Sequence, residues 1–217
     1  MSSRDSSRVD LGGRLRGARE RRGMTLRELA RRVGVSASLI SQIETSKAQP
    51  SVRTLYDIVS ELGISFDSLF GDAERGDWDA AHVIRSVGHH PEIPPVQRAT
   101  DRRGVEFAQG VRWESLTAIP VPGIEFLYIE YQPGSESGPP ENPQTHPGRE
   151  WGYVISGTLH VSVVGDEYVL GPGDAITFPC RLPHRLWNPG DEIVRGIWFV
   201  LGETPPKPST NGDDEAN

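Results

Sequence analysis

Residues 25–55 have the sequence TLRELARRVGVSASLISQIETSKAQPSVRTL, and this stretch decides the fold of the N-terminal part of the chain. Its apolar side chains recur every three or four residues, which is the period of a helix with one buried face. The recurring positions are Leu26, Leu29, Ala30, Val33, Leu39, Ile40, Ile43, Val52 and Leu55. Short polar interruptions divide them, so the stretch predicts three consecutive short helices.

The interruptions contain residues that start and stop helices. Thr25 and Glu28 have the spacing of a capping box, in which a hydroxyl and a carboxylate each satisfy a free backbone amide. Gly34 supplies a sharp turn, and Ser36 can cap the helix that follows it. The same helical period is present on both sides of this stretch. We therefore predict a bundle of four or five short helices over residues 10–70.

The chain changes character after residues 71–80, an acidic segment without an apolar period that we interpret as a linker. Short runs rich in β-branched and aromatic residues follow, separated by Gly and Pro at turns. The runs are His82–Val87, Val105–Phe107, Val111–Leu116, Glu125–Tyr131, Trp151–Ile155, Thr158–Val164, Tyr168–Leu170, Ala175–Phe178, His184–Trp187 and Ile193–Leu201. They predict an all-β double-stranded barrel over residues 81–201.

The two ends of the chain lack both patterns. Residues 1–9 and 202–217 are polar, and we expect a disordered N-terminal arm and a disordered acidic tail. The predicted fold class is therefore α+β with two domains, an all-α N-terminal bundle and an all-β C-terminal barrel.

Charge is divided unevenly between the two predicted domains. The formal net charge is −7, yet residues 1–70 contain 12 Lys and Arg against 8 Asp and Glu, a net of +4. Residues 71–217 therefore carry a net of −11. The basic residues 1–70 attract phosphates, whereas the acidic residues 71–217 repel them. The charge distribution therefore favours a nucleic-acid partner for the N-terminal domain only.

Cysteine content and hydropathy indicate a cytoplasmic protein. The single cysteine, Cys180, has no partner in the chain for a disulfide. No secretory signal is recognisable, and no apolar run approaches the roughly 18 residues that a membrane span needs. We expect no membrane partner.

The stretch that predicts the short helices resembles the helix-turn-helix of the Cro/C1 (XRE) family of transcription regulators, over roughly residues 11–70. The resemblance implies that the second helix of the motif, residues 36–44, enters the major groove of operator DNA as a recognition helix. Gln42 is the residue on it that can bond an adenine edge with two hydrogen bonds. The residues expected to contact DNA are Thr25, Arg27, Ser36, Ala37, Ser38, Ser41, Gln42, Lys47 and Arg53.

Within this set the expected roles differ. Thr25, Arg27, Lys47 and Arg53 lie near helix ends and are expected to contact phosphates. Ser36 is at least as well explained as a helix cap. Since operators of this family usually match a two-fold dimer, a homodimer is implied.

Two stretches of the barrel resemble the paired motifs of the cupin family. They are GPPENPQTHPGREWGYVISGTLHV at residues 138–161 and GPGDAITFPCRLPHRLWNPG at residues 171–190. The resemblance implies metal ligands at His146, Glu150 and His184, a set of two imidazoles and one carboxylate suited to Fe(II), Mn(II) or Zn(II). Gln144 stands where the family has its first His, so the usual fourth ligand is missing.

The alternative interpretation is that these side chains hydrogen-bond one another or an organic effector. A pocket for such an effector would be lined by polar and aromatic residues of the barrel. The candidates are Gln144, Tyr153, Phe178 and Trp187.

Two hypotheses from different classes follow. The first is a non-enzymatic transcription regulator whose barrel senses a small-molecule effector or a metal. The second is a non-haem iron cupin enzyme, because the hydroxypropylphosphonate epoxidase family also joins a helical domain to a cupin with two His and one Glu. The exposed polar face expected on helix 36–44 favours the regulator. A cupin isomerase or dioxygenase with a vestigial helical domain is a weaker third interpretation.

Overall fold

The structure is a computed structural model that describes residues 9–64, 66–70, 96–121 and 123–202. The predicted linker at residues 71–80 and the predicted strand His82–Val87 lie outside the described residues. So do nearly all of the two predicted disordered ends, at residues 1–8 and 203–217.

The N-terminal part is helical, as predicted. Its elements are α1 (Leu11–Arg21), α2 (Leu26–Val33), α3 (Ala37–Glu44), α4 (Val52–Leu62) and the short 3-10 helix η1 (Asp67–Leu69). The hydroxyls of Thr25 and Ser36 accept hydrogen bonds from backbone amides in the first turns of α2 and α3, at 3.2 and 3.1 Å. Gly34 ends α2 with a φ of 77°. Only the carboxylate of Glu28 departs from the predicted capping box, since it accepts a hydrogen bond from Arg32 at 3.0 Å instead.

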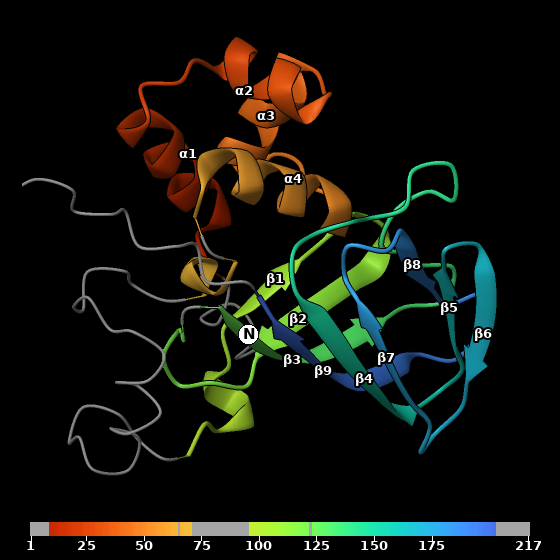
Figure 1. Ribbon diagram of the computed structural model, residues 1–217. Helices are drawn as coiled ribbons and strands as arrows, with labels where there is room; N and C mark the ends of the chain where they lie inside the picture. Colours follow the sequence, from red (N-terminus) through yellow and green to blue (C-terminus); the bar gives the residue numbers. More distant parts are fainter. Residues whose placement is uncertain (1–8, 65, 71–95, 122, 203–217) are drawn as a thin grey trace, which may run out of the picture.

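The C-terminal part forms two antiparallel sheets that face each other (Figure 1). Across the described residues the larger sheet has the order β1-β2-β3-β9-β4-β7, and the smaller has the order β6-β5-β8. The strands are β1 (Gly104–Glu106), β2 (Val111–Ser115), β3 (Ile124–Tyr131), β4 (Arg149–Ser156), β5 (Leu159–Val163), β6 (Asp166–Leu170), β7 (Ala175–Pro179), β8 (His184–Trp187) and β9 (Val194–Leu201). Each predicted run from Val105 onward corresponds to one of these strands, so the α+β fold class is confirmed.

Strand alternation decides which side chains enter the barrel. On β4, Glu150 and Val154 are buried, whereas Trp151 and Tyr153 point outward. Gly152 also points inward, and a Cβ at this position would lie 2.1 Å from the ring of Trp198 on β9. Only glycine fits there, and the indole of Trp198 therefore packs against β4 beside Glu150.

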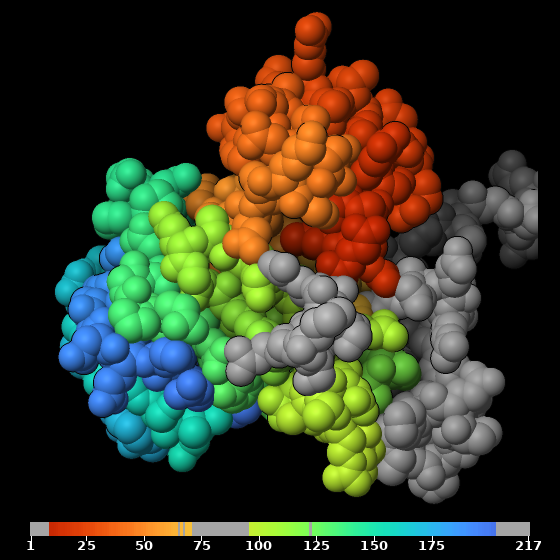
Figure 2. Space-filling model, turned by 180° about the vertical axis from the view of Figure 1, so that it is seen from behind, coloured from red at the N-terminus to blue at the C-terminus, as the bar shows by residue number. Residues whose placement is uncertain are grey.

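The helical bundle packs directly on the barrel. Figure 1 shows α4 as the helix nearest the strands, and Figure 2 shows the bundle seated on the barrel from the opposite side. The backbone amide of Ala108 donates to Pro50 O at 2.9 Å, and the rings of Phe66 and Trp113 lie 5.6 Å apart. Buried apolar residues of both parts belong to one continuous cluster. None of the described helices is long and apolar enough to cross a membrane.

Candidate functional site

The outer face of α3 is polar and exposed. Ser38 and Gln42 lie one turn apart on it, and Nε2 of Gln42 donates to Oγ of Ser38 at 3.1 Å. Ile40 and Ile43 face the bundle and are 1% and 2% exposed. The helix therefore presents small polar side chains outward on a firmly packed support, which suits close approach to a nucleic-acid groove.

The remaining residues expected to contact DNA, apart from Arg53, divide into three groups. Thr25, Arg27 and Lys47 are exposed, while Ala37 and Ser41 are half-buried. The hydroxyl of Ser36 is engaged as the cap of α3, as the cap interpretation expects.

Arg53 has a different position from the one expected. Its guanidinium donates to the carbonyl oxygen of Pro143 in the barrel and lies 3.3 Å from the carboxylate of Asp57. The backbone amide of Arg53 also donates to Ser137 O at 3.4 Å. Because these contacts turn the side chain toward the barrel, the structure corrects the expectation that Arg53 contacts phosphate.

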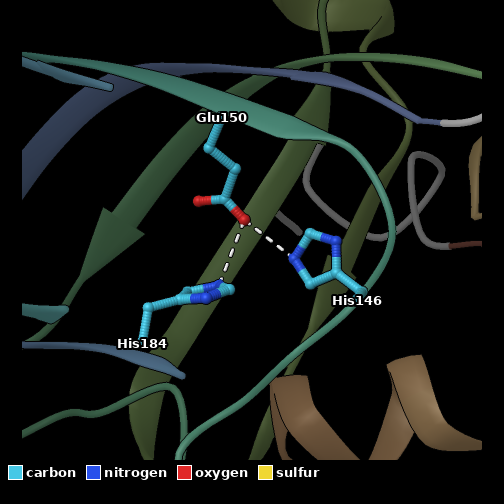
Figure 3. Close-up of side chains that lie close together, drawn as sticks. All are labelled: His146, Glu150 and His184. Carbon is cyan, nitrogen blue, oxygen red and sulfur yellow. Dashed lines mark hydrogen bonds and ion pairs between the residues drawn. The ribbon is translucent and has the colours of Figure 1, made fainter. Parts of the chain in front are cut away.

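A second cluster of functional side chains lies inside the barrel (Figure 3). His146, Glu150 and His184 come from the loop before β4, from β4 and from β8, and their potential ligand atoms all lie within 4.8 Å of one another. Oε1 of Glu150 is 2.8 Å from Nε2 of His146 and 3.2 Å from Nε2 of His184. All three side chains have at most 7% of their surface exposed. The structure thus brings together the three residues that the cupin resemblance implies.

Each imidazole makes a hydrogen bond through Nδ1, which leaves Nε2, the nitrogen that faces Glu150, as an acceptor. Nδ1 of His184 lies 2.8 Å from Leu182 O, and Nδ1 of His146 lies 3.3 Å from Pro147 O. A carbonyl only accepts, so in the neutral rings these contacts place the hydrogen on Nδ1 and a lone pair on Nε2. Two lone pairs and a carboxylate then converge on one point, where a cation or a proton is required between them.

The separations also fit a shared ion. Ligand atoms at right angles around an ion, each about 2.1 Å from it, lie about 3 Å apart. The two distances to Oε1 of Glu150 match this spacing. Nε2 of His184 is buried and makes no hydrogen bond of good geometry with any of the described residues. The donor set and its arrangement therefore fit a divalent metal.

Glu150 is held as a carboxylate by its neighbours. Burial by itself would raise its pKa, but when the two imidazoles carry a proton on Nε2, their contacts with Oε1 and their charges outweigh burial and hold the pKa of Glu150 well below its usual range. On the other side, Nε1 of Trp198 donates to Oε2 of Glu150 at 2.7 Å. The second oxygen is thereby fixed, and the first is directed at the imidazoles.

Gln144 lies beside this cluster without belonging to it. It is 4% exposed, and its backbone pairs with that of His184 in both directions, at 2.9 and 3.0 Å. Residues directly opposite in an antiparallel pair have side chains on the same face, so Gln144 and His184 both point into the barrel. Oε1 of Gln144 is buried, and no residue in the described part of the chain donates a hydrogen bond to it.

Two residues expected in an effector pocket lie outside the barrel. Tyr153 is 48% exposed because it alternates with the buried residues of β4. Trp187 alternates with the buried His184 and Leu186 on β8 and stacks under the guanidinium of Arg185 at 4.4 Å. Both expectations are therefore corrected. Phe178 does lie inside, with its ring 4.9 Å from that of His184.

Sequence reasoning missed two residues that contact the cluster. Trp198 lies within the predicted run Ile193–Leu201, but only its position in register with Gly152 reveals its bond to Glu150. Tyr56 was absent from every prediction, yet its ring stacks on that of His146, with centroids 4.2 Å apart and planes 4° apart. A polar aromatic residue on the buried face of α4 was the available signal.

Comparison with known proteins agrees with both halves of the structure. A helix-turn-helix family model, HTH_3, matches residues 15–69, and a cupin domain model, Cupin_2, matches residues 127–200. The chain is 26% identical to the HTH-type transcriptional regulator PuuR of Escherichia coli over 195 residues, which cover 89% of this chain and 94% of PuuR. It is 26% identical to the HTH-type transcriptional regulator SutR of the same species over 180 residues, 83% of this chain and 88% of SutR.

A solved structure has the same two-part fold. An HTH_3 family transcriptional regulator from Vibrio cholerae superposes with a TM-score of 0.61, at 21% identity. The match covers 90% of this chain and 96% of that chain.

Proposed function

Because the chain joins a helix-turn-helix domain of the HTH_3 family to a cupin domain of the Cupin_2 family and is homologous to the regulator PuuR, we propose that it is a transcription regulator that binds specific operator DNA. The observation that carries this proposal is the exposed polar face of α3, with Gln42 at its centre. The operator is expected to be two-fold symmetric and to be bound by a homodimer. The residues proposed to contact DNA are Thr25, Arg27, Ser36, Ala37, Ser38, Ser41, Gln42 and Lys47.

We further propose that the barrel is the sensor of this regulator, with a divalent metal held by His146, Glu150 and His184. The metal, when bound, supplies a positive charge and open coordination positions for a small-molecule effector. Gln144 and Phe178 are the residues proposed to face that effector, since both lie inside the barrel near His184. A regulator is favoured over an iron enzyme because both full-length relatives described above are transcriptional regulators.

Replacing Gln42 with alanine tests the DNA-binding role. A duplex selected by the wild-type protein from a random-sequence pool serves as the specific site. We expect Gln42→Ala to weaken binding to this duplex by about 1–3 kcal/mol, because one bidentate base contact is lost, and to leave binding to unrelated DNA nearly unchanged. Fluorescence anisotropy at fixed salt measures both affinities.

The matched control is Gln132→Ala, which removes an exposed amide from the barrel. It should leave both affinities unchanged. Equal losses on the selected duplex and on unrelated DNA in Gln42→Ala would contradict the base contact.

Replacing Trp198 with phenylalanine tests the support of the metal site. The ring is largely kept, but the Nε1 donor to Glu150 is lost. Loss of such an outer hydrogen bond typically costs about 10–100-fold in metal affinity. Calorimetric titration with Zn²⁺ measures the change, and an affinity equal to that of the wild-type protein would show that this bond does not support the site.

A further inference from the structure

Tyr56 places the DNA-binding domain in contact with the barrel site. Its ring lies flat on that of His146, at the 4.2 Å centroid distance given above, and the side chain is buried. Its hydroxyl donates to Oε2 of Glu125 on β3 at 2.8 Å. Burial raises the pKa of Tyr56 well above its ordinary value, and the charge of Glu125 raises it further, so the hydroxyl keeps its proton and remains a donor.

Both contacts of Tyr56 belong to the same part of the barrel. Glu125 on β3 and Glu150 on β4 both pair with Val200 on β9, the strand between them. The two carboxylates therefore occupy one row of the larger sheet. His146 forms its hydrogen bond to Glu150. Tyr56 thus contacts His146, a candidate metal ligand, through its ring. Through its hydroxyl it contacts Glu125, which lies in the same row of the sheet as Glu150, the second candidate ligand.

Arg53 provides a second connection from the same helix. It lies three residues before Tyr56, which places the two side chains on one face of α4. Its guanidinium holds the carbonyl of Pro143, the residue that precedes Gln144 in the loop leading to His146. The helix therefore holds this loop at Pro143 and again at His146.

α4 is connected to the recognition helix through α1 and α2, which contact both α3 and α4. Leu55 and Ile58 of α4 and Ile40 and Ile43 of α3 are buried in the bundle. Packed interiors do not deform continuously, so we expect the helices to reposition as a unit rather than one by one. A change at Tyr56 is then expected to change the position of α3 relative to the barrel.

From these contacts we infer that Tyr56 couples occupancy of the barrel site to DNA binding, so that the sensor site is shared between the two domains. This inference rests on the proposed function. A cation held by His146 fixes the orientation of the imidazole and makes it electron-poor, and an electron-rich phenol ring is attracted to such a partner. Metal binding therefore stabilises the docked arrangement of α4 relative to the undocked one, which is the differential interaction that coupling requires.

The test measures the affinity for Co²⁺ in the absence of DNA and in the presence of saturating DNA. Co²⁺ binding is followed by its visible absorption and by calorimetry, and the DNA is the duplex selected from a random-sequence pool. For the wild-type protein we expect the two Co²⁺ affinities to differ by at least about 5-fold, and the DNA affinity to change by the same factor when Co²⁺ is added, because coupling is reciprocal.

Three variants locate the coupling. Tyr56→Leu removes the stacked ring and should reduce the coupling factor, which is the ratio of the Co²⁺ affinities with and without DNA, to about 1. Co²⁺ should still bind through the three ligands. Tyr56→Phe keeps the ring but loses the bond to Glu125, and its factor should fall between these values. Tyr168→Leu removes an exposed tyrosine of β6 and should retain the wild-type factor.

The outcomes distinguish failure of the coupling role of Tyr56 from failure of the proposed function. A wild-type factor retained in Tyr56→Leu overturns the coupling role, as does a wild-type protein that binds Co²⁺ and DNA independently, and both leave the proposed function intact. Wild-type protein that binds no Co²⁺ overturns metal sensing together with the coupling, and protein that selects no DNA overturns the regulator. If Tyr56→Leu does not fold, a reduced factor in Tyr56→Phe supports the inference and an unchanged factor overturns it.

Discussion

Replacing His184 with alanine should abolish stoichiometric metal binding. The side chain has no exposed surface and contributes one of three converging ligand atoms, so its loss leaves only His146 and Glu150. Removing a ligand should cost more than the about 10–100-fold typical of an outer hydrogen bond. Elemental analysis of protein purified without chelator should find close to one metal ion per wild-type chain and almost none per His184→Ala chain.

Two further variants separate ligand loss from misfolding. Glu150→Gln keeps the size of the side chain, removes the charge and should also lose the metal. His160→Ala removes a half-buried histidine of β5 that packs on Trp187, away from the three ligands, and should retain it. Metal retained in folded His184→Ala, or absent from the folded wild-type protein, would contradict the proposed metal site and favour a purely organic effector.

Local signals in the sequence predicted most of the elements. The helix starts at Thr25 and Ser36 and the turn at Gly34 depend on hydrogen bonds between neighbours in the chain, so a short window contains the needed information. The same holds for the strands, whose period and turn residues are local. The spacing of the two cupin motifs likewise indicated that His146, Glu150 and His184 lie together, because it reflects the path of the strands that bring them together.

Errors arose where a side chain's direction depends on register or on the other domain. Tyr153 and Trp187 are aromatic residues of predicted strands, but the sequence did not indicate which alternating set enters the barrel. Arg53 is near a helix end, as phosphate contacts commonly are, yet α4 faces the barrel at that position. Tyr56 was missed for the same reason, because the docking of the two domains joins residues that are distant in the chain.

Replacing Glu44 with alanine should destabilise the helical domain strongly. The guanidinium of Arg19 on α1 donates two hydrogen bonds to this carboxylate at the end of α3, at 2.6 and 2.8 Å, and a third to Met24 O at 2.8 Å. The side chains of Arg19 and Glu44 are only 10% and 5% exposed. Breaking a buried pair costs about 3–5 kcal/mol because an unpaired charge remains, and we expect about 3 kcal/mol here since Arg19 keeps some contact with water.

Urea unfolding followed by far-UV circular dichroism, which is dominated by the helices, measures this loss. Two controls identify its origin. Arg16→Ala breaks the exposed pair between Arg16 and Glu20, which has a similar distance of 2.8 Å, and should change the midpoint little. The double variant Arg19→Met with Glu44→Leu removes both charges and should recover most of the stability, because no unpaired charge is then buried. A double variant as unstable as Glu44→Ala would instead mean that the geometry of the pair, and not the isolated charge, holds α1 against the recognition helix.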